Sequence, residues 1–164
     1  FSAVECGVAD GMTANFAAAQ GVVECPESFR LHLYDSWSAM REDDLTASDG
    51  GMEGRYDTIS QDLTRRNLDK YGPILSWHPG RIPETLDESA PDTVSWLHID
   101  LNSAKTTIQV LDFFFPRIRP GGVVLFDDYG WDGWAEMRLT VDDWFREKTG
   151  TLLPLPTGQA IYFK

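Results

Sequence analysis

The sequence predicts an α/β protein with a mostly parallel seven-stranded sheet, a C-terminal antiparallel hairpin and helices on both faces. Strand-like runs alternate with helical runs along the chain, which is the pattern of βα units around a parallel sheet. Runs such as Trp96–Ile99 and Val123–Phe126 are continuously hydrophobic, as expected for strands covered on both faces. The last two strand-like runs flank a Pro-Thr-Gly turn at 156–158, and this pattern predicts the hairpin.

The first half of the chain contains three of the predicted strands. Residues 41–56 are acidic, rich in glycine and poor in apolar residues, so they predict an exposed loop. After this loop, Ile59, Leu63 and Leu68 stand among charged residues, a spacing typical of an amphipathic helix that ends before Gly72-Pro73. The predicted elements are, in order, a strand at 2–6, a helix at 12–20, a strand at 29–34, a helix at 56–70, a strand at 74–77 and a short helix at 82–88.

The second half completes the sheet. Ile108, Leu111 and Phe115 share one face of a predicted helix, and Pro116 and Pro120 interrupt the pattern before the next strand. A later helix carries apolar residues at helical spacing, and the hairpin follows it. The predicted elements are a strand at 93–99, a helix at 103–115, a strand at 123–126, a helix at 135–148 and hairpin strands at 152–155 and 160–163.

Composition limits the classes of function. With 164 residues, the chain is long enough for one full core, and we expect residues 1–164 to form a single domain. The formal net charge of −12 argues against a nucleic-acid partner, because nucleic-acid binding depends on a basic surface. No apolar run approaches the length of a membrane span, so we expect no membrane partner. Cys6 and Cys25 lie in unlike contexts, which suits a reducing compartment and indicates a cytoplasmic protein.

Three carboxylates follow two predicted neighbouring strands. Asp100 ends the run Trp96–Ile99, and Asp127 and Asp128 end the run Val123–Phe126. Ligands of open α/β sheets bind beyond the carboxyl ends of the strands, so these acids are expected to share one crevice. Clustered carboxylates repel each other unless a proton or a cation intervenes, and Mg²⁺ prefers oxygen ligands. The acids therefore predict a Mg²⁺ site, although a solvated strand end or a helix cap remains the alternative for each.

A glycine turn follows the first predicted strand. Glu5 stands at the strand end, and Gly7 and Gly11 enclose the turn, so the backbone can turn tightly and approach a ligand closely. The spacing is Gly-x-x-x-Gly and differs from the Gly-x-Gly-x-x-Gly of dinucleotide sites. A wider turn preceded by an acid suits a ligand with an ammonium or sulfonium group. An ordinary strand-to-helix turn explains the pattern equally well.

Asp35 ends the second predicted strand. An acid at this place commonly binds both hydroxyls of a ribose, although Asp35 or Ser36 also fits the role of a helix N-cap. His98 lies two residues before Asp100, so both side chains point to the same side of the sheet. For His98 a core position is favoured over a role as a base. Glu5 and Asp35 together, at consecutive strand ends, indicate a nucleoside-type ligand more strongly than either residue alone.

Five blocks of the sequence, considered in order, extend over nearly the whole chain. They lie at 4–11, 35–37, 80–86, 98–100 and 120–130. In this order they resemble the macrocin O-methyltransferase-like family of class I S-adenosylmethionine-dependent methyltransferases, which act on sugar hydroxyls of natural products. The most specific block is Pro-Gly-Gly followed by Asp-Asp-Tyr-Gly, and the glycine turn is the least specific. The resemblance implies a Rossmann-like class I methyltransferase fold and O-methyl transfer.

The resemblance also implies roles for individual residues. Those expected to bind S-adenosylmethionine are Glu5, Gly7 and Gly11 at its methionine end, Asp35 and Ser36 at its ribose, and Gly80 in a turn near its adenine. Those expected to bind Mg²⁺ are Asp100, Asp127 and Asp128, with Asp100 also acting as the general base. Coordination of two vicinal acceptor oxygens to the metal would lower the pKa of the hydroxyl that is methylated.

The expected partner is a small molecule with a hydroxyl group, such as a sugar. Family members also carry an N-terminal helical segment that covers the cofactor and pairs subunits, so the resemblance implies a homodimer and a domain at 1–164 that lacks this segment. Asn102 departs from the family, whose members usually have a further acid there. A nicotinamide-dependent oxidoreductase is disfavoured by the missing Gly-x-Gly-x-x-Gly and by the hairpin. A non-catalytic subunit that binds a nucleoside is the second alternative.

Overall fold

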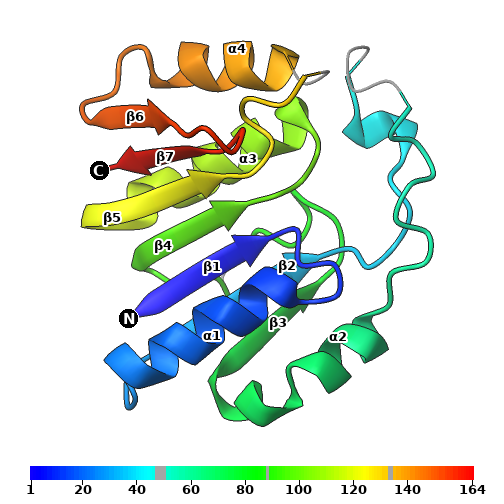
Figure 1. The fold of residues 1–164 in the computed structure, drawn as a ribbon, viewed down its shortest axis with the longest axis vertical. Coiled ribbons are helices and arrows are strands. Elements are labelled where there is room, and N and C mark those ends of the chain that lie inside the picture. The colour runs from blue at the N-terminus through cyan, green and yellow to red at the C-terminus, as the bar shows by residue number, and fades with distance from the viewer. Residues whose placement is uncertain (47–50, 88, 133–134) are drawn as a thin grey trace.

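The structure, a computed structural model, describes residues 1–46, 51–87, 89–132 and 135–164. Its seven-stranded sheet has the order β3-β2-β1-β4-β5-β7-β6 (Figure 1). Strands β1 to β5 run parallel, and β7 runs antiparallel to both β5 and β6. The predicted sheet and its hairpin are thereby confirmed. The strands are β1 Ser2–Cys6, β2 Arg30–Asp35, β3 Leu75–Pro79, β4 Val94–Ile99, β5 Ile118–Phe126, β6 Thr151–Pro154 and β7 Ala160–Phe163.

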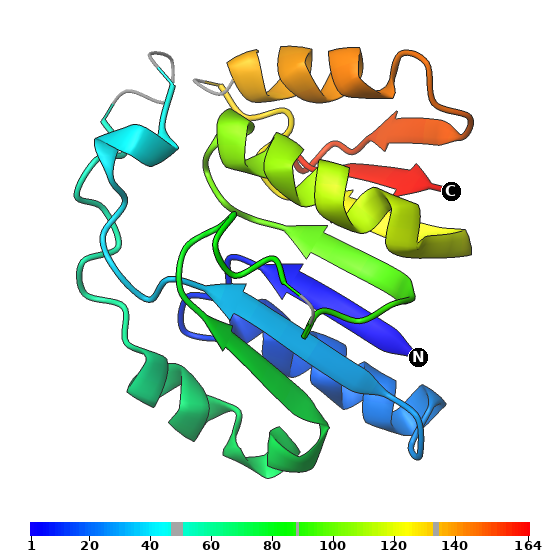
Figure 2. The same ribbon diagram turned by 180° about the vertical axis from the view of Figure 1, so that it is seen from behind.

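Helices cover both faces of the sheet. Helix α1 lies in front of the sheet in Figure 1, and α3 lies on the opposite face, toward the viewer in Figure 2. The α-helices are α1 Met12–Glu24, α2 Gln61–Asn67, α3 Ala104–Phe114 and α4 Ala135–Phe145, and three short 3₁₀ helices lie at Glu42–Asp44, Asp69–Ile74 and Phe115–Arg117. Among the described residues, no helix has the length and apolar character needed to cross a membrane.

Two apolar clusters hold the layers together, one on each face of the sheet. On the α3 face, Val4 and Leu97 pack with Leu111 of α3 and Val141 of α4, all of them fully buried. On the α1 face, strand residues pack against α1 and against Leu68 after α2. Alternate residues of β1 and β4 thus point to opposite clusters, which explains why both strands are continuously hydrophobic. Cys6 belongs to the first cluster, as expected for a core thiol.

Two predicted helices differ from the structure. The helix predicted at 56–70 is an α-helix only at 61–67, because Tyr56 has a left-handed backbone with a φ of 64° and Ser60 is extended, with a φ of −142°. After Leu68 the chain continues as the 3₁₀ helix Asp69–Ile74. The short helix predicted at 82–88 is wrong for residues 82–87, which form turns, and residue 88 lies outside the described residues. The amides of Thr85 and Leu86 donate to the carbonyls of Arg81 and Pro83, and the amide of Ala90 donates to the carbonyl of Asp87 in a separate turn.

Strand β5 begins five residues earlier than predicted, at Ile118 instead of Val123. The sequence predicts a strand that begins only after Pro120, because proline cannot donate to a ladder. The β4–β5 register shifts between Val94 and Trp96, and this irregularity accommodates the extra residues. On the other edge, the amide of Gly121 donates to the carbonyl of Lys164 at 2.7 Å, so the segment is paired despite the proline.

Candidate functional site

The parallel strands bring the predicted site residues to one edge of the sheet. Gly7 follows β1, Asp35 ends β2, Asp100 follows β4 and Asp127 follows β5, and these four strands are consecutive neighbours. A cavity opens at this edge. Predicted residues that line it are Gly7, Asp35, Ser36, Gly80 and Asp100.

The glycine turn packs directly on the end of β4. Gly7 has a φ of +88°, a left-handed conformation that favours glycine, and a Cβ built on it would overlap the carbonyl oxygen of Asp100. The amide of Asp100 donates to the carbonyl of Cys6 at 2.9 Å, and the amide of Gly7 donates to the carbonyl of Tyr34 at 2.9 Å. The sequence places glycine here because no side chain fits between the turn and β4.

Asp35 holds the glycine turn. Its Oδ2 accepts hydrogen bonds from the amides of Val8, at 2.7 Å, and Ala9, at 2.9 Å. Its Oδ1 accepts from the amide of Trp37 at 2.6 Å. A carboxylate has about four acceptor positions, so one on Oδ1 is left for a ligand hydroxyl. Neighbouring Ser36 lies at the cavity wall, where its hydroxyl donates to the carbonyl of Ser38 at 3.4 Å.

Glu5 and Gly11 lie outside the cavity, since neither is among the described residues that line it. Glu5 is 1% exposed and faces His98, with 3.6 Å between its Oε1 and the Nδ1 of the histidine. Burial raises the pKa of Glu5, and the interaction with His98 opposes that rise. Gly11 is the N-cap of α1, and a Cβ there would press on Thr64 and Leu68. Gly11 therefore sets the packing of the turn against α2.

The acids at the ends of β4 and β5 form a cluster. His98, Asp100 and Asp127 each offer one ligand atom, and these atoms lie within 4.8 Å of one another. Asp127 Oδ1 also accepts from Nε2 of Gln159 at 2.6 Å. Asp128 Oδ2 accepts from the amide of Asn102 at 2.8 Å. The structure thus brings together the three predicted acids and adds His98, which the sequence left in second place.

The cluster carries strong electrostatic repulsion. Burial raises the pKa of Asp100 to about 7, and the carboxylates of Asp128 and Asp127 contribute to the rise. At neutral pH Asp100 is therefore close to its midpoint of protonation. A group in this state can exchange a proton with a hydroxyl, and a cation bound to the cluster would remove the repulsion.

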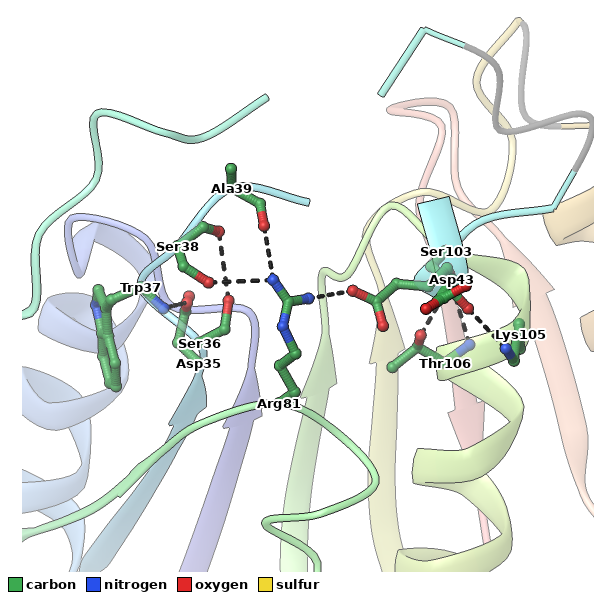
Figure 3. A network of polar contacts seen from close by, with 11 residues as sticks. Asp35, Ser36, Trp37, Ser38, Ala39, Asp43, Arg81, Ser103, Lys105 and Thr106 are labelled. Atoms are coloured by element: carbon green, nitrogen blue, oxygen red, sulfur yellow. Dashed lines mark hydrogen bonds and ion pairs between the residues drawn. The ribbon is translucent and has the colours of Figure 1, made fainter. Parts of the chain in front are cut away.

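The segment 38–46, which we call the strap, crosses the cavity at the same edge of the sheet. Arg81 fixes one part of it: Nη2 donates to the carbonyl of Ala39 at 2.8 Å, and Nη1 pairs with the carboxylate of Asp44. Figure 3 shows the guanidinium of Arg81 beside the carbonyl of Ala39. Because Arg81 and Asp44 also line the cavity, the strap forms one of its walls.

The N-terminus of α3 holds the other part of the strap. Ser103 Oγ donates to the carbonyl of Asp44, and Lys105 Nζ donates to the carbonyl of Asp43 at 2.7 Å (Figure 3). Ser103 also caps α3, since its Oγ accepts from the amide of Thr106 at 3.1 Å. The strap is thus joined to the sheet edge through side chains of two separate segments.

Tyr56 and Asn102 stand where the cavity meets the acids. Both line the cavity, and their side chains are hydrogen bonded to each other. Burial raises the pKa of Tyr56, with further contributions from Asp100 and Asp128. The phenol and the amide provide neutral donors and acceptors beside the carboxylates, which suits contact with a hydroxyl compound.

Sequence reasoning did not identify Arg81, Gln159 or Tyr56 as individual site residues. Each of them acts through a contact with a residue at least 32 positions away in the chain. Local spacing contains no signal for such contacts. A partial signal existed for Arg81, because it stands directly after Gly80 in one of the resembling blocks.

Comparison with known proteins identifies relatives of the chain. A family model described as a methyltransferase domain matches residues 4–129. The 8-demethyl-8-(2,3-dimethoxy-alpha-L-rhamnosyl)-tetracenomycin-C 4'-O-methyltransferase of Streptomyces olivaceus is 25% identical over 138 residues, 79% of this chain. Mycinamicin III 3''-O-methyltransferase of Micromonospora griseorubida is 31% identical over 68 residues, 40% of this chain. The matches span 53% of the first relative and 27% of the second, so the chain covers about half or less of their length.

Solved structures share the fold. The O-methyltransferase NovP superposes with a TM-score of 0.86 at 20% identity, covering 99% of this chain and 71% of that one. CalS11, a calicheamicin methyltransferase, gives a TM-score of 0.85 at 18% identity with the same coverage. These likenesses confirm the predicted Rossmann-like class I methyltransferase fold.

Proposed function

Because the chain belongs to the methyltransferase domain family, we propose that it is an S-adenosylmethionine-dependent O-methyltransferase acting on a hydroxyl of a sugar or a similar small molecule. The observation that carries the proposal is the packing of the glycine turn against Asp100. Through it, a cofactor-type turn and a carboxylate able to take a proton share one cavity. The names of the curated relatives, which are both O-methyltransferases, support a hydroxyl acceptor.

The cavity residues fit the proposed cofactor. S-adenosylmethionine supplies a methyl group on a positively charged sulfur, which makes that carbon open to attack. Gly7 leaves its side of the cavity free of side-chain atoms, and Asp35 has an acceptor position for a ribose hydroxyl. Gly80 also lines the cavity and lies next to Asp35, because its amide donates to the carbonyl of Asp35 at 2.9 Å. We assign the ribose contact to Asp35 and the wall near the adenine to Gly80.

We also propose that Asp100, Asp127 and Asp128 hold a divalent cation, with Mg²⁺ as the first candidate. Carboxylate oxygens are the ligands that Mg²⁺ prefers. The donor set fits a cation, because burial and, after it, the neighbouring carboxylates of Asp128 and Asp127 raise the pKa of Asp100, and a cation would offset both effects. His98 adds a nitrogen within 4.8 Å of Asp100 and Asp127, so Mn²⁺ should be tested beside Mg²⁺.

Asp100 is proposed as the general base. A hydroxyl is a poor nucleophile while it keeps its proton, and a base with a pKa near the working pH removes that proton most effectively. Asp100 lies on the cavity wall, and its pKa is about 7 in the metal-free protein; a bound cation would lower this pKa together with that of the hydroxyl. Tyr56 and Asn102 on the same wall would orient the acceptor, and this alignment lowers the entropic part of the barrier.

The first test is a calorimetric titration with S-adenosylhomocysteine and, separately, with MgCl₂ before and after EDTA treatment. Binding of S-adenosylhomocysteine in the micromolar range and a separate magnesium heat are expected. Asp127→Ala should lose the magnesium heat and retain S-adenosylhomocysteine binding. If wild-type protein binds NADH and does not bind S-adenosylhomocysteine, the proposed cofactor is wrong.

The acceptor class is tested by transfer of a labelled methyl group. CalS11 is described as a TDP-rhamnose 3'-O-methyltransferase, so TDP-rhamnose is the first acceptor to test. Methylated product on a sugar hydroxyl would support the proposal. Other sugars and catechols should be tested as acceptors after TDP-rhamnose. If the protein binds the cofactor and methylates none of these compounds, the alternative of a non-catalytic nucleoside-binding subunit is favoured.

Replacing Gln159 with methionine is expected to weaken magnesium binding about tenfold, because residues that orient metal ligands are commonly worth 10- to 100-fold in affinity. Methionine keeps the length of the side chain but cannot donate to Asp127 Oδ1, which Gln159 does at 2.6 Å. Calorimetry with MgCl₂ measures the effect. Gln109→Met on α3 is the matched control and should leave the affinity unchanged; equal affinities in all three proteins would contradict the orienting role.

A further inference from the structure

The peptide groups of the glycine turn are held from two sides. On one side, Asp35 accepts from the amides of Val8 and Ala9. On the other side, the carbonyl of Ala9 accepts from Thr64 Oγ1 at 2.6 Å and from Trp37 Nε1 at 3.1 Å. The carbonyl of Asp10 accepts from Asn67 Nδ2 at 2.9 Å. The turn is therefore fixed by side chains of the protein itself.

Thr64 is the buried centre of this arrangement. Its side chain is fully buried, and its hydroxyl oxygen lies 3.0 Å from Trp37 Nε1. The hydroxyl has one proton, which it donates to the carbonyl of Ala9 because the carbonyl of Ser60 is farther away, at 3.1 Å. The indole N–H also has one proton, which is shared between Thr64 Oγ1 and the carbonyl of Ala9. Thr64, Trp37 and Ala9 thus form a closed triangle of hydrogen bonds between α2, the segment after β2 and the glycine turn.

The triangle holds Ala9 and Trp37 in a backbone conformation that is unfavourable for residues other than glycine. Ala9 has a φ of 46° and Trp37 a φ of 43°, a left-handed backbone that is unfavourable for a residue with a side chain. Such conformations persist only where the surroundings determine them. The amide of Trp37 is held by Asp35, and its indole by Ala9 and Thr64, so each strained residue is bonded to the same set of partners.

The indole of Trp37 is itself fixed by packing. Its ring centroid lies 5.6 Å from that of Trp77, and the guanidinium of Arg65 stands 4.3 Å over the Trp77 ring. Arg65 follows Thr64 on α2. One helix therefore supplies both the hydroxyl of the triangle and the cation that covers the tryptophan pair.

We propose that Thr64 and Trp37 are positioning residues for the cofactor. They set the glycine turn in its binding conformation before the ligand arrives, so that the ligand does not have to order the turn. Preorganisation of this kind increases affinity by removing an entropic cost of binding. The inference rests on the proposed function, because it takes the turn next to Gly7 as the wall that contacts the cofactor.

Thr64→Val tests the proposal, because valine has the shape of threonine without the hydroxyl. We expect the affinity for S-adenosylhomocysteine, measured by calorimetry, to fall about tenfold, as for one buried hydrogen bond that is lost. In the cofactor-free protein, amide hydrogen exchange of a peptide that covers residues 7–11 should become several-fold faster. Thr64→Ser keeps the hydroxyl and should restore the affinity to within about threefold of wild type.

The chain offers a matched control in Thr107→Val. Thr107 on α3 is 1% exposed, and its hydroxyl has no hydrogen-bond partner among the described residues. Thr107→Val should change neither the affinity for S-adenosylhomocysteine nor the amide hydrogen exchange of residues 7–11. The positioning role would be overturned if Thr64→Val and Thr107→Val had equal effects on affinity and exchange, or if Thr64→Val left the affinity unchanged. Neither result would contradict the proposed function. Wild-type protein that does not bind S-adenosylhomocysteine would instead overturn the proposed function on which the role depends.

Discussion

Replacing Asp100 with asparagine is expected to lower the rate of methyl transfer at least about a hundredfold, the usual contribution of a general base. Asparagine keeps the shape of the side chain and cannot accept a proton. The affinity for S-adenosylhomocysteine should stay within a few-fold of wild type, because the backbone contacts of residue 100 to Cys6 and Gly7 are unchanged. Turnover within a few-fold of wild type would show that another group takes the proton.

The same substitution is expected to stabilise the metal-free protein above neutral pH. The pKa of Asp100 is about 7 in the folded protein, against an ordinary value of 3.8. The folded state therefore binds the proton more tightly than the unfolded state, so this group makes the free energy of unfolding fall as pH rises from about 4 to about 7. A rise of about three pKa units corresponds to about 4 kcal/mol, so at pH 8 asparagine removes a penalty of this order, which corresponds to roughly ten degrees in Tm.

Thermal unfolding at pH 6 and pH 8 in the presence of EDTA measures this effect. Between these two values wild type should lose more stability than Asp100→Asn. Asp92→Asn is the control, because it removes the same charge from an exposed residue before β4. A Tm difference between wild type and Asp100→Asn that does not depend on pH would contradict the electrostatic explanation.

Replacing Gly7 with alanine is expected to abolish binding of S-adenosylhomocysteine and to lower the free energy of unfolding by about 3 kcal/mol or more. The new methyl group would overlap the carbonyl oxygen of Asp100, a backbone atom that cannot rotate away. The turn or the end of β4 would have to move, and both line the cavity. Chemical denaturation and calorimetry give the two quantities.

Gly121→Ala separates the overlap from the backbone strain. Gly121 has a φ of +76°, close to that of Gly7, but no described atom lies within 4 Å of a Cβ built there. This variant should lose only about 1–2 kcal/mol and bind S-adenosylhomocysteine normally. If the two alanine variants lose the same stability, the contact between Gly7 and Asp100 is not what requires glycine at position 7.

Much of the fold could be predicted from the sequence, because a buried parallel strand is visible as a short apolar run and its end as the polar residue that follows the run. The apolar runs before Asp35, Asp100 and Asp127 identified the strands, and their carboxyl ends necessarily meet at one edge. The hairpin followed from the turn at 156–158. The helix predicted at 82–88 failed because a few apolar residues at suitable spacing cannot outweigh turn-forming neighbours over so short a stretch.

The site was predictable only in part. The acids were found from the sequence, but their partners, Gln159 for Asp127 and the amide of Asn102 for Asp128, were not. The strap and the residues that support the acids and the turn depend on tertiary contacts. Thr64 illustrates this: within α2 it is an ordinary helical threonine, and its role depends on Ala9, 55 residues before it.

The contact between Gly7 and Asp100 has a consequence for redesign of the molecule. The turn after β1 and the end of β4 touch through backbone atoms, so they behave as one rigid block. A substitution in this block meant to accommodate a bulkier cofactor analogue would shift the carboxylate at the same time. The strap is attached to the sheet edge through the side chains of Arg81, Ser103 and Lys105, and its backbone bonds at Met40 are to Gly54 and Arg55. Exchange of the strap is therefore expected to leave the block unaltered. New specificity should therefore be engineered in the strap, with the glycine turn left as it is.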